Sequence, residues 1–600
     1  MNPKSQAGGQ AGQAGLLPRL ITLSTLVIIV FGIIMLRLYY LQIIRGELYR
    51  TKSESNRIQP VMHNAPRGLI YDRNGELIVS HRPSFTLGLL PFRDGISEKE
   101  QDDLKERLAS ILGMDEKRLS EIFAERMKNP FDVIQVKYDL SDTELAHIME
   151  RKEQFRRVVI EVDTRRQYLK KDKGSVILGY VSEINKPELS KLKKINPSYR
   201  SGNLIGKNGI EKTYEQYLKG VDGITQVEIT ASGYQLRAIR EMPAVQGNSL
   251  HLTVDWKIQE FMEKAMEGKK GSAILMDCRS GEIIGMVSNP SYDPNVFTDL
   301  NNPSRIKGIL TDKEKPLFNK VIQSLYPPGS TFKIVLSVAA LEENLVDTSL
   351  EYFCGGSYYA GKTFECWKKE GHKWFNIESA IISSCNVFFY QLGIKKLGVD
   401  LIAKFSRLMG LGAKTGIDLP GEAGGIVPST AWKKKVYKDK WYTGETANFS
   451  IGQGYLLVTP LQMALVYSTF INGGKVFVPY IVKEVRDING KVIFKNKPKV
   501  VRDNHFSEKT YKTVKNALKG VVERGTAAYS GKIKDFYFGG KTGTAQNPHG
   551  DDHAWFLCYF DYSSPRYVMA VFVENGGHGS TAAAPVAREV IMKMRENGML

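Results

Sequence analysis

The feature that most limits what this chain can become is the uncharged run Leu20–Leu36, LITLSTLVIIVFGIIML. Extended to Ile43, it provides the roughly 20 apolar residues that a helix needs to cross a bilayer. Tyr39 and Tyr40 have the composition of a membrane-interface belt, and no small-residue cleavage site follows them. The run therefore predicts an uncleaved signal anchor over residues 20–44. A cleaved signal peptide is the alternative.

No other stretch approaches membrane-spanning length, so the remaining ~550 residues are expected to form a folded mass on one side of the bilayer. The chain carries 83 Lys and Arg against 64 Asp and Glu, a formal charge of +19. Beside a membrane, this charge fits a basic face near anionic lipid or an ordinary solvated surface better than nucleic-acid binding. The Arg165-Arg166 pair is expected to lie on such a solvated face.

The sequence after the anchor divides into two regions with different patterns of predicted helices and strands. Residues 45–248 mix helix-like runs such as Glu98–Leu112 with strand-like runs such as Arg157–Val162, which predicts an irregular α+β pedestal. In residues 249–600, strands are expected early (Gly271–Asp277) and late (Phe536–Thr544 and beyond), around a largely helical block. This order predicts one α/β sandwich with an antiparallel sheet, and the whole chain is expected to be an α+β multidomain protein.

The first chemical motif is Tyr326-Pro-Pro-Gly-Ser330-Thr-Phe-Lys333. The prolines and glycine predict a turn, and the apolar periodicity after them predicts a helix that starts near Ser330. Lys333 lies one helical turn later on the same face, where it is expected to be within reach of the Ser330 hydroxyl. A lysine that is buried beside other cations loses its proton at accessible pH and is then able to deprotonate the serine.

Two further motifs, together with the first, make up a set of candidate catalytic residues. Ser384-Cys385-Asn386 offers a hydroxyl and a carboxamide that are suited to shuttling a proton and holding a substrate amide. In Gly539-Gly-Lys541-Thr542-Gly543-Thr544, expected on a strand, Lys541 is suited to a terminal carboxylate. The Thr544 N–H is suited to form an oxyanion hole with that of Ser330.

Each motif is weak alone, but their order S-x-x-K, S-x-N, K-T-G is the pattern of acyl-serine transpeptidases and β-lactamases. A phosphate-binding loop ending at Lys541 is excluded, because it requires glycine where the chain has Asp535. A β-lactamase remains an alternative, with Glu422 or Glu445 as the residue that would activate water. A β-lactam sensor that acylates without turnover is a further alternative.

Five cysteines occur, and three of them form the pattern Cys354-x11-Cys366-x5-His372-x12-Cys385. Three thiolates and an imidazole are a complete tetrahedral set for a structural Zn²⁺, although the spacing matches no standard zinc finger. A Cys354–Cys366 disulfide is the alternative. If zinc is bound, the site would fix the loop that carries Ser384 and Asn386. Asp551, Asp552 and His553 are expected to form a turn between strands, with His553 near the rim of the active site.

With these motifs, the chain resembles class B penicillin-binding proteins over nearly its whole length after the anchor, and the elongation type more than the septal type. The resemblance includes Arg67-Gly-x-Ile-Tyr-Asp-Arg-Asn-Gly75, Gly206-x-x-Gly-Ile-Glu211 and Trp367-Lys-Lys-Glu-Gly-His372. The septal type remains the alternative within the class.

The resemblance implies a peptidoglycan D,D-transpeptidase, with Ser330 as acylated nucleophile and β-lactam target, Lys333 as base, and Ser384 and Asn386 as the second motif. Lys541, Thr542, Gly543 and Thr544 would be the third motif. It implies no cofactor for catalysis. It also implies stem peptides of lipid II-derived glycan as substrate. The implied partners are a polytopic shape-and-elongation family glycosyltransferase and other elongation-complex membrane proteins. Residues 1–19 would be cytoplasmic, and the single-pass anchor in the inner membrane would hold the catalytic domain outside the cytoplasm.

Overall fold

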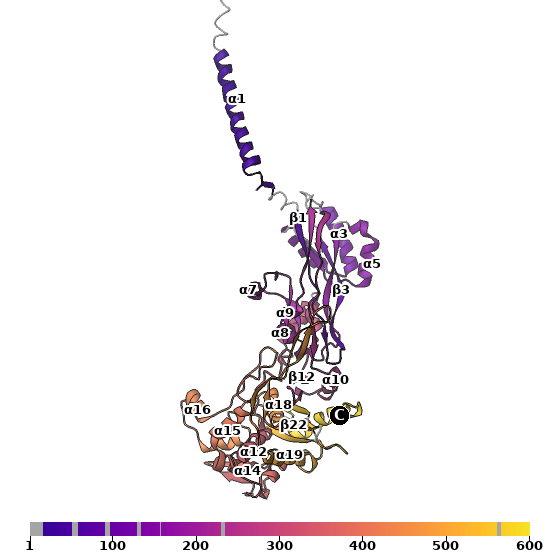
Figure 1. Ribbon diagram of the computed structural model, residues 1–600. Coiled ribbons are helices and arrows are strands. Elements are labelled where there is room, and N and C mark those ends of the chain that lie inside the picture. Colours follow the sequence, from indigo (N-terminus) through magenta and orange to yellow (C-terminus); the bar gives the residue numbers. More distant parts are fainter. Residues whose placement is uncertain are drawn as a thin grey trace, which may run out of the picture.

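The computed structural model describes residues 16–600, except 48, 51–57, 90–96, 129–133, 156–157, 230–234, 300, 561–563 and 565. Figure 1 shows helix α1 standing apart from the rest of the chain, with the pedestal in the middle and the catalytic domain at the far end. The α+β multidomain fold expected from the sequence is confirmed.

The N-terminal apolar stretch is a single helical segment, consistent with a single-pass membrane anchor. Helix α1 (Leu16–Tyr39) continues as the π-helix η1 (Tyr40–Ile44), and the stretch Pro18–Ile44 is long and apolar enough to cross a membrane. Its side chains are exposed, as expected of a helix whose solvent is lipid. In the described part of the chain no other helix meets these criteria. Of the expected tail 1–19, residues 1–15 lie outside the described residues.

The pedestal combines a long antiparallel strand pair with a small helical core. Strand β3 pairs with β5 from Val79 opposite Tyr168 to Leu89 opposite Val158. Helix α3 starts at a capping box formed by Ser97 and Glu100, and its leucines pack with apolar residues of α4 and α5. The pedestal elements are β1 (Ile58–His63), β2 (Ile70–Tyr71), β3 (Leu77–Leu89), α3 (Glu98–Leu112), α4 (Glu116–Lys128), β4 (Ile134–Lys137), α5 (Asp142–Glu150), η2 (Lys152–Phe155), β5 (Val158–Tyr168), α6 (Ser175–Leu178), β6 (Val181–Glu183), α7 (Lys186–Ile195), β7 (Leu204–Gly206), α8 (Gly209–Thr213), α9 (Glu215–Leu218), β8 (Gly223–Ile229) and β9 (Gln235–Met242).

The expectation that Arg165 and Arg166 lie on a solvated face is wrong. Arg165 is 8% exposed and Arg166 is 2% exposed. Arg166 Nε donates to a carboxylate oxygen of Glu211 at 2.7 Å, and Arg67 also donates to Glu211. Glu211 lies on α8, 45 residues after Arg166, so the counterion that permits this burial comes from tertiary structure.

One sheet joins the pedestal to the catalytic domain. Strand β10 (Ser249–Leu252) pairs in parallel with β2 of the pedestal and antiparallel with β18 (Val482–Arg486) of the catalytic domain. Because these backbone hydrogen bonds continue across seven strands, the two parts are tied together by main chain as well as side chains.

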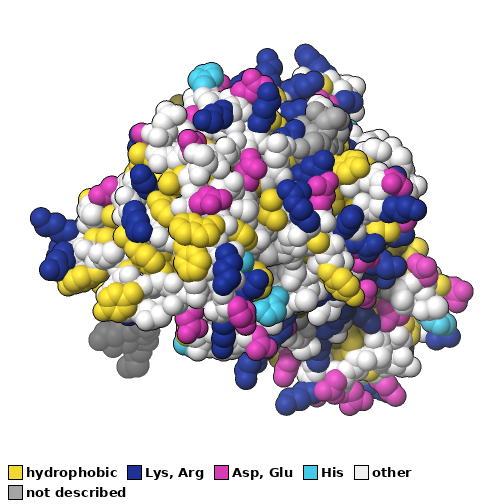
Figure 2. All heavy atoms as spheres, turned by 90° about the horizontal axis from the view of Figure 1, so that it is seen from below, with side chains coloured by type: hydrophobic (Ala, Val, Ile, Leu, Met, Phe, Trp, Pro, Cys, Tyr) yellow, Lys and Arg dark blue, Asp and Glu magenta, His cyan; other side chains and the backbone are white. Residues whose placement is uncertain are grey.

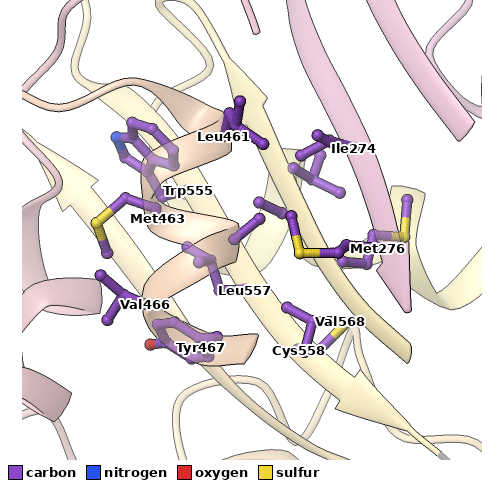
Figure 3. Packing of buried hydrophobic residues seen from close by; sticks show 14 of the residues in the cluster. Ile274, Met276, Leu461, Met463, Val466, Tyr467, Trp555, Leu557, Cys558 and Val568 are labelled. Atoms are coloured by element: carbon purple, nitrogen blue, oxygen red, sulfur yellow. The ribbon is translucent and has the colours of Figure 1, made fainter. Parts of the chain in front are cut away.

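The catalytic domain is built on a five-stranded antiparallel sheet, which confirms the expected sandwich. The strand order is β12 (Ile283–Asn289), β11 (Gly271–Asp277), β23 (Tyr567–Val573), β22 (His553–Phe560) and β21 (Gly539–Ala545). Every residue of β11 and β23 is buried, so both faces of the sheet are covered. Figure 3 shows helix α18 (Pro460–Ile471) lying across one face, with Leu461 on the side of the helix nearer to Ile274 of β11. Val466 of this helix and Leu557 of β22 belong to the same buried cluster. Helices α10 and α21 pack against each other and against β12, β22 and β23.

The helices and strands of this domain follow one another along the chain from β10 to α21. They are β10, α10 (Trp256–Ala265), β11 (Gly271–Asp277), β12 (Ile283–Asn289), η3 (Pro294–Thr298), α11 (Pro303–Thr311), η4 (Gly329–Phe332), α12 (Lys333–Glu342), β13 (Tyr352–Cys354), β14 (Ser357–Tyr359), β15 (Thr363–Glu365), β16 (Lys373–Phe375), α13 (Ile377–Ile382), α14 (Asn386–Leu392), η5 (Gly393–Leu397), α15 (Gly398–Leu408), α16 (Thr430–Tyr437), α17 (Thr443–Ser450), α18 (Pro460–Ile471), β17 (Lys475–Phe477), β18 (Val482–Arg486), β19 (Val492–Lys495), β20 (Val500–Asp503), α19 (Glu508–Glu523), β21 (Gly539–Ala545), β22 (His553–Phe560), β23 (Tyr567–Val573), α20 (Gly579–Ala582) and α21 (Ala584–Glu596).

The charge of the molecule is mixed over the face that Figure 2 shows, the end of the catalytic domain seen from below. Lysine and arginine side chains alternate there with aspartate and glutamate. The excess of positive charge on this face is therefore distributed among acidic groups, as on an ordinary solvated surface.

Candidate active site

Ser330 lies in a tight turn that aromatic core residues hold in place. It sits in the 3-10 helix η4, and Gly329 before it has φ +56°, a conformation that favours glycine. The indole Nε1 of Trp555 donates to the Pro327 carbonyl at 3.0 Å, and the Tyr467 hydroxyl donates to the Thr331 carbonyl at 3.1 Å. Because Trp555 and Tyr467 belong to the buried core in Figure 3, the turn is fixed by the packing of the sheet against α18.

Lys333 is the first residue of α12 and is completely buried. Its ammonium donates to the Ser384 carbonyl at 2.8 Å, to the Ser384 hydroxyl at 3.2 Å and to Asn386 Oδ1 at 2.8 Å. Burial lowers the pKa of Lys333 to about 8, against the opposing influence of the Cys385 and Cys366 thiols. Among the described hydrogen bonds, none joins this ammonium to the Ser330 hydroxyl.

The second motif connects two helices. Helix α13 ends at Ile382, and α14 begins at Asn386. Ser384 between them has φ +55°, an unfavourable value for a residue with a side chain, and is only 6% exposed. The contacts with Lys333 hold Ser384 and Asn386 beside the start of α12.

The third motif is β21, the edge strand of the sheet, and it packs directly on the turn that contains Ser330. A Cβ on Gly543 would lie 3.0 Å from the Pro328 carbonyl oxygen, and one on Gly329 would lie 2.7 Å from that of Thr544. The glycines therefore permit the close approach of strand and turn. Lys541 is buried, and its pKa lies well below the usual range because of burial and the nearby Lys333.

All three motifs thus converge. Hydrogen bonds join Lys333 to Ser384 and Asn386, and backbone contact joins β21 to the Ser330 turn. The structure adds Thr526, which sequence reasoning missed: its hydroxyl lies 2.6 Å from that of Thr542. No sequence pattern marks Thr526, because the contact depends on how the end of α19 packs beside β21.

The cysteine and histidine side chains also converge. The potential ligand atoms of Cys354, Cys366, His372 and Cys385 lie within 4.8 Å of one another, and all four residues are buried. His372 Nδ1 lies 3.6 Å from Cys354 Sγ and 3.5 Å from Cys366 Sγ. Zinc at ~2.3 Å from sulfur and ~2.05 Å from nitrogen would separate such atoms by about 3.6 Å at the tetrahedral angle. The donor set therefore fits zinc, and all five cysteines are free thiols, without the alternative disulfide.

Glu422 and Glu445 have structural partners. Glu422 accepts hydrogen bonds from the main chain and hydroxyl of Thr415, and Glu445 forms an ion pair with Lys433. These contacts engage both carboxylates within the helical block. His553, as expected, begins β22 after the loop containing Asp551 and Asp552, and its ring packs edge-on against Tyr326, which precedes the Ser330 turn.

Comparison with known proteins agrees with this geometry. Residues 271–592 match the penicillin binding protein transpeptidase domain, and residues 62–252 match the penicillin-binding protein dimerisation domain. The peptidoglycan D,D-transpeptidase MrdA of Haemophilus influenzae is 32% identical, over 94% of this chain and 89% of its own length.

Two solved structures are similar along most of the chain. Penicillin-binding protein 2 of Helicobacter pylori, in its complex with MreC, has a TM-score of 0.78 at 27% identity, over 90% of this chain and all of that one. A chain from a peptidoglycan synthase complex described as coordinating polymerization and crosslinking has a TM-score of 0.72 at 29% identity, over 96% and 98%. The chain belongs to the class B penicillin-binding proteins and is an elongation-type, serine-dependent peptidoglycan D,D-transpeptidase of the penicillin-binding protein 2 group.

Proposed function

We propose that Ser330 attacks the carbonyl carbon between the last two D-alanines of a stem peptide, with Lys333 in its neutral form taking the serine proton. The observation that carries this proposal is the buried Lys333 with a pKa of about 8, one turn from Ser330 and held by the second motif. Catalytic hydrogen bonds commonly tighten only when substrate binds. The lysine therefore needs to exchange one contact with Ser384 for one with Ser330.

The roles that we propose for the remaining groups follow from the position of β21 beside Ser330. The main-chain N–H groups of Ser330 and Thr544 stabilise the oxyanion, and Lys541 with Thr542 binds the terminal carboxylate. Gly543 keeps the strand close to the turn. The arriving carboxylate favours the charged form of Lys541, so binding restores the proton that burial disfavours.

The reaction ends in two transfers. Collapse of the tetrahedral intermediate breaks the peptide bond, and the leaving D-alanine amine takes a proton relayed through Lys333 and Ser384. The amine of a neighbouring stem peptide then attacks the acyl-enzyme carbonyl and forms the amide cross-link. The ester bond to Ser330 Oγ breaks, and the proton that the amine loses returns to Oγ through Lys333. A β-lactam would acylate the same hydroxyl.

The proposed substrate, together with the N-terminal apolar helix, supports a location at the inner membrane with the catalytic domain outside the cytoplasm. In this proposal residues 1–19 are cytoplasmic, 20–44 span the inner membrane, 45–248 form the pedestal and 249–600 form the catalytic domain outside the cytoplasm. The pedestal and anchor would bind a polytopic glycosyltransferase and an MreC-like protein. This is supported by the similarity to the chains of those two complexes.

The Cys354, Cys366, His372 and Cys385 cluster would hold a structural zinc ion. Four protein ligands leave no position open for water, so the ion would supply rigidity and no chemistry. Cys385 lies between Ser384 and Asn386, so the ligand set would fix the catalytic second motif.

The experiment that tests this function is a turnover assay with the full chain, a D-alanyl-D-alanine donor and an amine acceptor, in the presence of the polymerase. Cross-linked product that is lost in Ser330→Ala is expected. Released acid without cross-link would indicate a hydrolase, and acylation without turnover would indicate a sensor; either result would overturn the proposal.

A further inference from the structure

Helix α16 and the segment that follows it expose lysine and aromatic side chains on the catalytic domain. Figure 1 shows this helix at the edge of the domain, well away from the membrane helix α1. We call these exposed residues the α16 surface, and they are Lys434, Lys435, Val436, Tyr437, Lys438, Lys440 and Tyr442. An exposed apolar patch that is rimmed by charged groups marks an interaction site in many proteins.

The positive charge of the α16 surface is not balanced by neighbouring groups. Within the described residues, none of its four lysine ammonium groups forms an ion pair. The one acidic residue between positions 430 and 442 is Asp439, and its carboxylate lies 3.5 Å from the ammonium of a different lysine, Lys433. Four like charges therefore face solvent over a short stretch of chain, and their summed field attracts a polyanion.

The buried Lys433 holds this surface in place. Lys433 is 2% exposed, and its ammonium forms an ion pair with Glu445 of α17 and lies 4.6 Å from the centre of the Tyr442 ring. Helix α17 is itself fixed in the domain by the buried side chains of Ala447 and Phe449. The exposed lysines thus stand on a rigid support, which reduces the conformational entropy that binding would cost.

The α16 surface adjoins the segment that touches the Ser330 turn. The ring centre of Tyr437 lies 5.2 Å from that of Tyr455. Tyr455 follows Gly452, whose carbonyl accepts a hydrogen bond from the Gly329 N–H at 3.0 Å. A polymer that is bound at the α16 surface is therefore one pair of packed rings away from the chain segment beside the nucleophile.

We propose that the α16 surface binds the glycan strand of peptidoglycan next to the stem peptide that reacts. The four lysines pair with free carboxylates of the stem peptides on that strand. The rings of Tyr437 and Tyr442, which are 53% and 48% exposed, contact the apolar C–H faces of the sugars. Peptidoglycan fits this surface better than a membrane does, because α16 lies well away from α1 in Figure 1.

This inference rests on the function proposed above, because a transpeptidase acts on stem peptides that a glycan strand carries. It adds that the chain recognises its substrate as a polymer, through a surface outside the three catalytic motifs.

The test is co-sedimentation of the penicillin-treated full chain, in detergent, with insoluble peptidoglycan. The test variant changes all four lysines of the α16 surface at once: Lys434→Gln, Lys435→Gln, Lys438→Gln and Lys440→Gln. Its binding is expected to be at least about tenfold weaker, because four exposed ion pairs are lost. The matched control removes the same charge from exposed lysines of α7 in the pedestal and should bind as the wild type does: Lys186→Gln, Lys191→Gln, Lys193→Gln and Lys194→Gln.

Two further arms test the chemistry of the partner. Peptidoglycan whose carboxyl groups have been converted to amides should bind at least about tenfold more weakly to the wild-type chain. Tyr437→Ala should weaken binding to unmodified peptidoglycan about threefold or more. Binding of poly-glutamate as tight as that of peptidoglycan would indicate a general polyanion surface and overturn the proposal.

Unchanged binding in the four-lysine variant, or an equal loss in the α7 control, would also overturn it. Stoichiometric acylation by penicillin shows that each variant is folded. Because co-sedimentation needs no turnover, a failure of the proposed function is seen separately, as a wild-type chain without penicillin adduct or cross-linked product.

Discussion

The Lys333 ammonium donates to Asn386 Oδ1 at 2.8 Å, so the proposed base is held by the second motif and not by the serine it would deprotonate. This relationship makes Asn386 a positioning residue for the base. It also links the protonation of Lys333 to the loop that carries the cysteine cluster.

The pH dependence of acylation should follow Lys333. Its pKa of about 8 means that the protonated, inactive form predominates below pH 8. The rate of β-lactam acylation is therefore expected to rise about tenfold per pH unit below this value and to level off above it. Stopped-flow acylation between pH 6 and 10 measures this, and a rate independent of pH would contradict the role of Lys333.

The Asn386→Asp change should shift the pH dependence of acylation. A carboxylate in place of the amide would favour the charged lysine and raise its pKa, so the midpoint is expected to shift to higher pH. Asn386→Ala removes the acceptor without adding charge and serves as the comparison. If both variants kept the wild-type midpoint, the contact between Asn386 and Lys333 would have no part in tuning the base.

Two glycines offer a matched test of the turn that contains Ser330. Gly452 has φ +74°, and a Cβ there would lie 2.2 Å from the Gly329 carbonyl oxygen; Gly473 has φ +85° and open space around it. Both Gly→Ala changes carry a backbone cost of about 1–2 kcal/mol. Only Gly452→Ala should also displace Gly329 and reduce acylation by at least about tenfold. Equal acylation by the two variants would show that the turn tolerates displacement.

The zinc proposal predicts that thermal stability and acylation activity are reduced together when the metal is removed. Removing the metal with a chelator, or changing Cys366→Ser, should lower both the melting temperature and the acylation rate, because the second motif loses its support. Cys558→Ser, a buried thiol of β22 outside the cluster, should retain one zinc per chain. Metal analysis with acylation kinetics decides this, and unchanged acylation in metal-free protein would argue against the role.

Tyr467→Phe tests the aromatic support of the turn. It removes the donor to the Thr331 carbonyl and is expected to cost about 1 kcal/mol of unfolding free energy. Tyr529→Phe changes a fully exposed tyrosine and should cost nothing measurable. Chemical denaturation of the two variants gives the comparison; indistinguishable curves would exclude a contribution from the Tyr467 hydroxyl.

The motifs were predictable because their chemistry is local. Ser330 and Lys333 are one turn apart on any helix, and Lys541 lies in a glycine-rich run of strand-like residues. The cysteine cluster was predictable from ligand type, but its closeness depends on short strand pairs such as β13 with β16. Nothing local indicated the positive φ of Ser384.

The burial of charged side chains could not be predicted from the sequence. In the sequence, Arg165 and Arg166 look like a pair of surface arginines. Their burial depends on partners that are distant along the chain, Thr298 for Arg165 and Glu211 for Arg166. Thr526 was missed for the same reason, since its partner Thr542 is on another element. Long-range partners decide such cases, and a pattern along the chain does not contain them.

The central claim is that Ser330 is the acylated residue. Intact mass spectrometry after penicillin treatment should show one added penicillin mass per wild-type chain and none on Ser330→Ala. An adduct of equal yield on Ser330→Ala, or no adduct on the wild-type chain, would contradict the account.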